Sequence, residues 1–258
     1  MALELYNDGH HIGILFQNLV TGEAVQANQA LILDRGEAAL LDPGGEMTFA
    51  ALQSALGAYL GYDDGGPNYV LASHQDPDVI SSLDLWLTQT SCRIVMPAVW
   101  ERFIPHLTHP GRLTDRVISI PDQGHNLPLG NSQIQALPAH FLHAEGNFSF
   151  YDPVSRILFS GDIGANFPRH GLHKPVTELA EILPWMEPFH RRHMGANKVC
   201  RFWADMVRDL AVEKLVPQHG RFIEGAAAVR EFLDWFAELE CGIDLVSQDL
   251  YRPPQMDA

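Results

Sequence analysis

The sequence is poor in cysteine and in basic residues, and it contains no long apolar run. The three cysteines lack Cys-x-x-Cys spacing, which excludes a zinc knuckle, and they are too few for a disulfide framework. Only 17 Lys and Arg accompany 32 Asp and Glu among 258 residues, and the resulting net charge of −15 disfavours a nucleic-acid partner. No segment approaches the roughly 18 apolar residues of a membrane-spanning helix, and the first residues lack a signal-peptide pattern. We therefore expect a cytoplasmic protein that binds neither nucleic acid nor membrane.

The pattern of apolar segments and turn residues predicts an α/β fold in one domain over residues 1–250, with a loose tail at 251–258. The expected strands cover 12–19, 29–34, 37–42, 68–73, 93–96, 117–120, 134–138, 147–152, 156–160 and 214–217. The expected helices cover 49–60, 79–88, 98–107, two or three segments within 176–210, and 225–239. Because the two halves repeat the same order, we expect an αββα sandwich, two facing sheets with helices outside. In such a fold the functional residues lie at the strand ends along one edge of the sandwich.

Histidine and aspartate side chains follow four of the expected strands. The first loop reads Ser73-His74-Gln75-Asp76-Pro77-Asp78, and in an extended loop its alternate residues face the same way. The loop after 134–138 carries two histidines, His140 and His143, and the other two strand ends carry Asp162 and His219. Each segment alone is also compatible with an ordinary polar loop, but together they predict a metal site, since histidine is the commonest metal ligand. The candidate ligands are His74, Asp76, Asp78, His143, Asp162 and His219.

These segments resemble the metallo-β-lactamase superfamily, whose first loop reads H-x-H-x-D-H, and within it the flavodiiron proteins, whose loop reads H-x-E-x-D. The resemblance covers residues 30–225 and includes the stretches Phe141-Leu142-His143-Ala144-Glu145-Gly146-Asn147, Ser160-Gly161-Asp162, Phe189-His190-Arg191-Arg192-His193-Met194 and Pro217-Gln218-His219-Gly220. It implies two metals: His74, Asp76 and His143 on the first, Asp78 and His219 on the second, and Asp162 bridging them.

Three further positions matter for this resemblance. Asp42, after the expected strand at 37–42, resembles a structural residue of the superfamily. Asp76 stands where flavodiiron proteins usually have the longer Glu. Val79 stands where zinc hydrolases of the superfamily have a histidine, so the second metal lacks one imidazole here.

The donor set favours iron. Three carboxylates and three imidazoles without a thiolate suit iron or manganese at least as well as zinc. We therefore expect two Fe ions with a bridging oxo or hydroxo group, with Zn or Mn as alternatives. Flavodiiron proteins continue into a flavodoxin-like domain, for which this chain leaves no room, so we expect no FMN.

Without FMN, the chain is similar to the stand-alone oxygen-binding di-iron proteins of bacterial chemotaxis. The resemblance implies a homodimeric sensor or carrier of O2 (or NO) with a signalling partner. One alternative is an O2 or NO reductase served by an external reductase. Another is a metal-dependent hydrolase of the phosphodiesterase type, which could use basic residues for an anionic substrate (Arg169, Arg191, Arg192, Lys198 and Arg221). Whether the protein is an enzyme stays open at this point.

The other chemically notable side chains have simpler interpretations. Surface positions are expected for five histidines: His10, His11, His106, His109 and His125. His140 either orients a ligand or lies on the surface, and His190 and His193 share one face of a helix. Cys92 and Cys200 are expected to be inert core thiols. The candidates for the wall of an apolar O2 pocket are Phe148, Phe150, Tyr151, Trp185 and Trp203.

Overall fold

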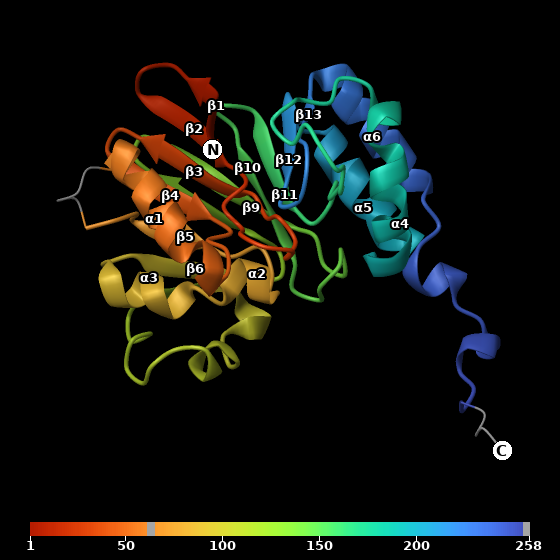
Figure 1. The fold of residues 1–258 in the computed structure, drawn as a ribbon, viewed down its shortest axis with the longest axis horizontal. Coiled ribbons are helices and arrows are strands. Elements are labelled where there is room, and N and C mark those ends of the chain that lie inside the picture. The colour runs from red at the N-terminus through yellow and green to blue at the C-terminus, as the bar shows by residue number, and fades with distance from the viewer. Residues whose placement is uncertain (61–64, 255–258) are drawn as a thin grey trace.

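The computed structural model, which describes residues 1–60 and 65–254, shows two β-sheets face to face with helices on both outer faces (Figure 1). The first sheet has the strand order β1-β2-β3-β4-β5-β6-β7, and the second has the order β13-β12-β11-β10-β9-β8. The first sheet comprises β1 (Ala2–Asn7), β2 (His11–Phe16), β3 (Gln29–Asp34), β4 (Glu37–Leu41), β5 (Tyr69–Leu71), β6 (Arg93–Pro97) and β7 (Val117–Ile120). The second comprises β8 (His125–Leu129), β9 (Ser132–Pro138), β10 (Phe148–Asp152), β11 (Ile157–Gly161), β12 (Lys214–Pro217) and β13 (Ile223–Glu224). The predicted αββα sandwich is confirmed.

The parallel strand pairs determine where the helices lie and which strand ends meet at one edge of the sandwich. Strands β4 to β7 are parallel to one another, and β11 is parallel to β12. Because a parallel pair needs a crossover connection, the chain passes over the outer face of its sheet between the two strands. The crossovers carry α1 (Glu46–Leu60), α2 (Pro77–Ile80), α3 (Leu83–Gln89), α4 (Leu183–His193) and α5 (Asn197–Arg208), and α6 (Ala226–Glu238) follows β13. The ends of β4, β5, β11 and β12 thus supply loops to one edge of the sandwich.

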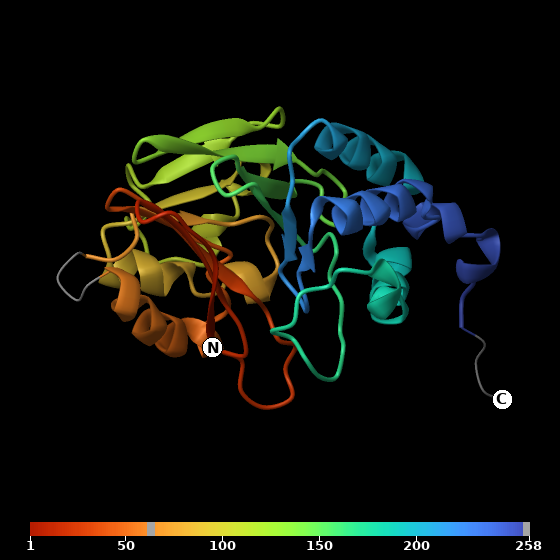
Figure 2. The same ribbon diagram turned by 90° about the horizontal axis from the view of Figure 1, so that it is seen from above.

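Alternating side chains divide the core into three apolar layers. Figure 2 shows the sheets and helices from a second direction. In β3, Leu31 packs under α1 and α3, whereas Ile32 points between the two sheets, where it meets Phe150 and Phe159 of the second sheet. The third layer lies between the second sheet and α4 to α6. Each sheet is therefore buried on both faces, which explains why β4, β10 and β11 are almost wholly apolar or buried.

Two of the predicted helices are wrong or incomplete. Residues 98–107 form only short 3₁₀ turns at Ala98–Trp100 and Ile104–His106, because Pro105 removes a backbone donor there. The predicted helix 79–88 is divided at Ser81–Ser82 into α2 and α3. Strands β1, β8 and β13 were not expected, and all of them lie at or next to an edge of their sheet.

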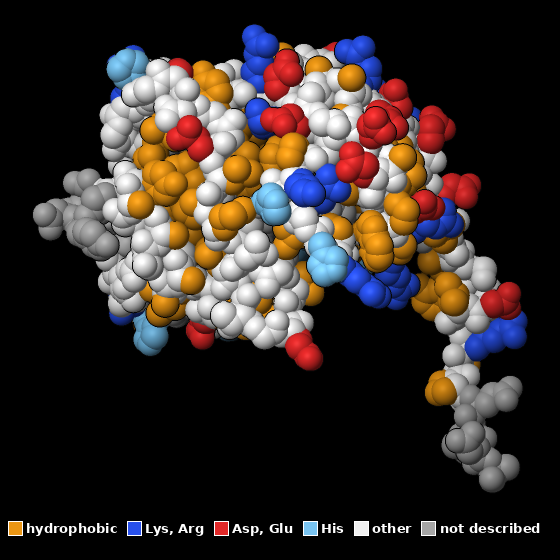
Figure 3. All heavy atoms as spheres, turned by 45° about the horizontal axis from the view of Figure 1, so that its top comes forward, with side chains coloured by type: hydrophobic (Ala, Val, Ile, Leu, Met, Phe, Trp, Pro, Cys, Tyr) orange, Lys and Arg blue, Asp and Glu red, His pale blue; other side chains and the backbone are white. Residues whose placement is uncertain are grey.

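The C-terminal segment leaves the body of the protein after α6 (Figure 1). It contains two short 3₁₀ turns, η4 (Gly242–Leu245) and η5 (Gln248–Leu250), and exposes Ile243, Leu250 and Tyr251. Figure 3 shows apolar side chains on the surface of this arm. The predicted tail 251–258 lies within the described residues only as far as 254. None of the helices within 1–60 and 65–254 is long and apolar enough to cross a bilayer.

Candidate metal centre

The first ligand loop follows β5 and turns directly into α2. His74 is buried, and Asp76 is the extended N-cap residue of α2, whose first position is Pro77. Asp78 therefore lies in the first helical turn, so the expectation of one extended loop holds only as far as Asp76. The helical turn sends Asp78 in a different direction from Asp76, and the two carboxylates reach different histidines.

The first cluster consists of His74, Asp76, His143 and Asp162, each of which offers an atom within 4.8 Å of the others. The Nε2 atom of His143 lies 3.4 Å from Asp76 Oδ2 and 3.1 Å from Asp162 Oδ2. The Nε2 atom of His74 lies 3.8 Å from Asp76 Oδ2 and 3.9 Å from Asp162 Oδ2. Four side chains from three separate loops therefore point toward a common centre.

The second cluster uses the other oxygen of Asp162. The Nε2 atom of His219 lies 3.3 Å from Asp162 Oδ1 and 3.3 Å from Asp78 Oδ2. Asp162 thus faces the first cluster with Oδ2 and the second with Oδ1. The carboxylate of Asp162 is only 4% exposed and follows β11 after Gly161, whose φ of +60° is easily adopted by glycine. A carboxylate shared in this way is the arrangement expected of a bridging ligand.

The contacts within the clusters shift the pKa values of both histidines and carboxylates. Burial alone would lower the pKa of His143, but Asp162 and Asp76 outweigh it and raise this pKa to about 10. Likewise, Asp162 and Asp78 overcome the effect of burial and raise the pKa of His219 to about 10. Burial would raise the pKa of Asp162, but its histidine partners hold it well below the usual range. The hydrogen bond with His143 lowers the pKa of Asp76.

The side chains present fit a pair of metal ions. Within the described residues, two buried atoms at the centre, His74 Nε2 and Asp162 Oδ1, have no hydrogen-bond partner. Ligands about 2.1 Å from one ion lie roughly 3.0–3.4 Å apart, close to the separations found here. The other ring nitrogens are engaged elsewhere: His74 Nδ1 lies 2.9 Å from Ser73 Oγ, and His219 Nδ1 donates to the carbonyl oxygen of Gln26 at 2.7 Å. These contacts direct both Nε2 atoms toward the centre.

Two buried residues hold the ligand loops in place. Asp42 accepts the backbone N–H of Ser73 at 2.8 Å, next to His74, and burial raises the pKa of Asp42 to about 6. This contact is consistent with the structural role expected for Asp42. His190 accepts the N–H of Gly164 on Nε2 at 2.8 Å, two residues after Asp162, and its Nδ1 lies 2.9 Å from the carbonyl oxygen of Met186. Burial lowers the pKa of His190 to about 4, so its ring is neutral and remains an acceptor.

An aromatic wall stands beside the two clusters. Phe189 stacks on His193 with ring centroids 4.4 Å apart, and His193 lies 5.8 Å from the His143 ring. Phe167 lies 5.4 Å from Phe189 and 5.5 Å from the ring of His219. Sequence reasoning missed Phe167 and Phe189, although the i, i+4 spacing of Phe189 and His193 placed them on one helix face.

Other aromatic and histidine predictions need correction. The side chains of Phe148 and Phe150 lie in the core between the sheets. Tyr151 and Trp203, the latter on α5 itself, lie in the apolar layer between the second sheet and α4 to α6, and Trp185 is exposed.

His11 was predicted at the surface but is 2% exposed. Its Nε2 lies 2.7 Å from Asp152 Oδ2, and its Nδ1 lies 3.6 Å from Asp34 Oδ1. His11 therefore links the first sheet to the second through two acidic side chains, which compensate for its burial. His140 bonds to the carbonyl oxygen of Asp122 at 2.8 Å.

Comparisons with known proteins agree with this geometry. Residues 25–220 match the model of a family described as ODP family beta lactamase. The chain belongs to this family. It is 38% identical to the protein in the structure "Peroxy diiron species of chemotaxis sensor ODP", with a TM-score of 0.83 over 95% of this chain and 97% of that chain. The apo state of the chemotaxis sensor ODP from T. denticola is 37% identical over the same shares, with a TM-score of 0.84.

More distant structures share the fold of this ODP family member. A mutant flavo di-iron protein from Thermotoga maritima has a TM-score of 0.72 at 18% identity, over 92% of this chain and 60% of that chain. The comparison with curated proteins finds no match. The expected metallo-β-lactamase fold and the similarity to flavodiiron and stand-alone di-iron proteins are thus confirmed.

Proposed function

We propose that this protein is a non-haem di-iron protein that binds O2 and acts as an oxygen sensor. The observation that carries the proposal is the buried carboxylate of Asp162, which faces His143 with one oxygen and His219 with the other. The similarity to a chemotaxis sensor whose structure is described as a peroxy diiron species supports the same function. The absence of a thiolate from the six ligands favours iron or manganese over softer metals.

The proposed ligands are divided unequally between the two irons. His74, Asp76, His143 and Asp162 would hold one iron, and Asp78, His219 and Asp162 would hold the other. When bound, a di-iron(II) pair would supply electrons to a diatomic ligand such as O2. Val79 is fully buried beside Asp78 and supplies no donor, so the second ion keeps fewer protein ligands than the first.

The protein's own residues leave one side of the centre open. His74 and Asp162 are buried, whereas Asp76 and Asp78 have side chains 34% and 39% exposed. A small ligand therefore approaches from the side of these two aspartates, beside the Phe167–Phe189–His193 wall. The apolar faces of Phe167 and Phe189 limit the water at this opening. Burial and the neighbouring His143 lower the pKa of His193, so it stands at the opening as a neutral ring that can donate one hydrogen bond.

The hydrolase alternative lacks a specific observation in its favour. A zinc hydrolase of this superfamily would use a histidine where Val79 is buried. Of the basic residues considered for an anionic substrate, Arg221 is bound to Glu181 and to two backbone carbonyls, and Arg191 pairs with Glu187. We also propose that the protein acts as a homodimer and passes its signal to a protein partner.

The test is metal content together with an optical spectrum, on protein purified without oxygen and then exposed to air. We expect two irons per chain and new visible bands that form on exposure to O2 and persist. Bands that appear only transiently while a reductant is supplied would favour the reductase. Two zincs without an optical change would refute the di-iron proposal.

A matched pair of variants localises the centre. His143→Gln removes a proposed ligand and should lower the iron content and abolish the optical change. His140→Gln, three residues away, removes a contact with the carbonyl oxygen of Asp122 and an edge-on contact with the Phe148 ring, but no proposed ligand, and should retain both. Equal iron content in the two variants would contradict the proposed ligand set.

A further inference from the structure

Two buried cysteines lie side by side in the C-terminal half of the protein, and neither belongs to the metal centre. Cys200 lies in the first half of α5, and Cys241 is the N-cap residue of η4. Their Sγ atoms are 3.6 Å apart although 41 positions separate them in the sequence. Both are free thiols with no exposed surface. The expectation of an inert core thiol at Cys200 did not include this neighbour.

The segment that carries Cys241 is fixed onto the connection between α4 and α5. The backbone N–H groups of Cys241 and Asn197 both donate to Asp244 Oδ2, at 3.2 and 2.6 Å. The N–H of Ile243 donates to the carbonyl oxygen of Gly195 at 2.9 Å. Gly242, with φ +51°, lies so close to this connection that a Cβ atom would collide with the carbonyl oxygen of Gly195. These contacts hold the two sulfurs together.

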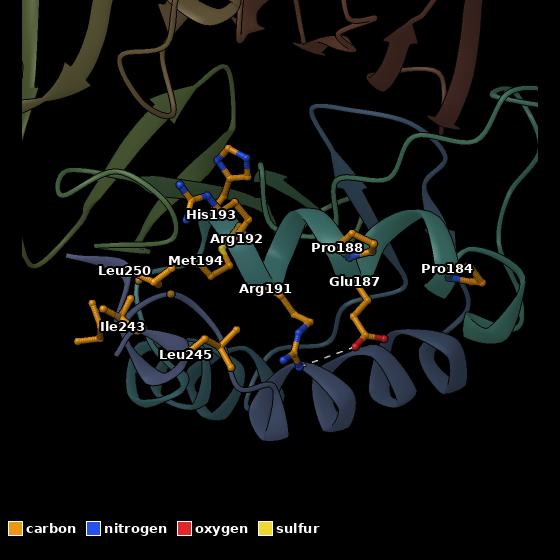
Figure 4. A pocket seen from close by; sticks show the side chains of 13 residues that line it. Pro184, Glu187, Pro188, Arg191, Arg192, His193, Met194, Ile243, Leu245 and Leu250 are labelled. Atoms are coloured by element: carbon orange, nitrogen blue, oxygen red, sulfur yellow. Dashed lines mark ion pairs between the residues drawn. The ribbon is translucent and has the colours of Figure 1, made fainter. Parts of the chain in front are cut away.

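A solvent cavity of about 730 Å³ adjoins this segment (Figure 4). Its lining includes Met194 and Gly195 on one side and Gly242 and Ile243 on the other, so the residue next to Cys241 forms part of the wall. Figure 4 also shows Arg191 in this cavity, paired with Glu187 at 3.9 Å. No side chain of η4 is buried, so a local opening of this segment breaks the hydrogen bonds of Asp244 and Ile243 but uncovers no buried side chain of η4. Small polar molecules can therefore reach Cys241 by a local opening of η4.

The two thiols are not equivalent. The hydrogen bond from Cys200 lowers the pKa of Cys241, and the Arg191 guanidinium lowers it further, although burial and Asp244 oppose them. The same hydrogen bond, together with burial, raises the pKa of the Cys200 thiol. A thiolate is the reactive form of cysteine. Cys241 directly precedes Gly242 in the wall of the cavity, whereas Cys200 lies within α5, so a small oxidant that enters from the cavity reaches Cys241 first.

We propose that Cys241 and Cys200 are a peroxide-reactive dithiol, in which Cys241 is oxidised first and Cys200 then closes a disulfide. The Cys241 thiolate attacks one oxygen of hydrogen peroxide or an organic hydroperoxide. The O–O bond breaks, and the second oxygen leaves with a proton as water or an alcohol.

The sulfur of Cys200 then loses its proton and attacks the sulfenic sulfur of Cys241, whose hydroxyl leaves as a second water. With hydrogen peroxide, two thiols and one peroxide thus give one disulfide and two waters. The sulfurs must approach by about 1.5 Å to reach the length of an S–S bond. The disulfide would tie the start of the C-terminal arm covalently to α5. This inference concerns a different site from the di-iron centre and does not rest on the proposed function.

In the test, the full-length, metal-loaded protein is treated with hydrogen peroxide, and the oxidation state of each cysteine is followed by peptide mass mapping. A zinc-loaded sample is treated in parallel, so that iron-driven oxidation is excluded. Cys92 serves as the internal control, because it is also fully buried but has no thiol neighbour within the described residues. We expect loss of two thiols, a Cys200–Cys241 cross-linked peptide, reversal by dithiothreitol, and a rate at least about tenfold above that of Cys92.

A substitution separates the two roles. In Cys200→Ser the reaction should stop at a sulfenic acid on Cys241, which dimedone traps, whereas Cys241→Ser should leave Cys200 reduced. Retention of all three thiols in the wild-type protein would overturn the proposal, and so would oxidation of Cys92 at the same rate. The mapping of the wild-type protein decides the question even if a variant fails to fold.

Discussion

Loading metal into the metal-free protein should release a defined number of protons. Without metal, the pKa values of His143 and His219 are both about 10, so at pH 7.5 more than about 99% of each ring is protonated. A metal ion binds only the neutral imidazole and therefore displaces both protons. The pKa values of Asp76 and Asp162 are lowered, so these carboxylates are already ionised and contribute none. We expect these two rings to release about two protons per chain, and ionisation of a metal-bound water can only add to this number.

The assay is anaerobic calorimetric titration of Fe(II) at pH 7.5 in buffers with different ionisation enthalpies. The slope of the observed enthalpy against the buffer enthalpy gives the number of protons released. His219→Gln should lower that number by about one, since one protonated ring is removed. His193→Gln is the matched control, because the pKa of His193 is lowered and the ring is already neutral. Release of fewer than about one proton in the wild type, or an unchanged number in His219→Gln, would refute the reasoning.

Three further predictions follow from buried contacts. The pKa of His11 is raised because Asp152 and Asp34 outweigh the effect of burial, so its contribution to stability is complete below pH about 6.5 and is lost as pH rises through the raised pKa. His11→Asn should lower the free energy of unfolding by about 3 kcal/mol at pH 6 and flatten its pH dependence, as urea denaturation will show. His190→Leu leaves the N–H of Gly164 without its acceptor and should weaken metal binding about tenfold with a lower Tm; unchanged metal affinity would exclude a positioning role. Gly220→Ala forces φ +86° on alanine and brings its Cβ into collision with Asn166. It should lower the free energy of unfolding by more than about 1 kcal/mol and reduce the iron content. Gly9→Ala, also at positive φ but in open space, should leave the iron content unchanged.

The loops that carry the proposed ligands could be predicted from the sequence because strand ends leave local signals. Asp162 directly follows a short apolar strand and His219 comes two residues after another, and parallel strands bring such ends to one edge. The structure brings all six predicted ligands together, and their role in metal binding stays a proposal. The helical position of Asp78 was not predicted, since Pro77 fits both a loop and the first turn of a helix.

Contacts between distant segments could not be predicted in the same way. His11 looks like a turn residue after Gly9, and only the packing of β2 against the end of β10 buries it beside Asp152. Phe167 belongs to a loop without periodicity, so nothing local connected it with His219. The proximity of Cys200 and Cys241 likewise depends on how the segment after α6 returns to α5.

The most direct test of the central claim is a crystal structure of anaerobically loaded protein with anomalous diffraction recorded on both sides of the iron absorption edge. Two iron peaks per chain are expected. One should lie among His74, Asp76 and His143, the other between Asp78 and His219, and Asp162 should contact both. A single peak, a pair of peaks that do not share Asp162, or peaks at the zinc edge alone would contradict the central claim.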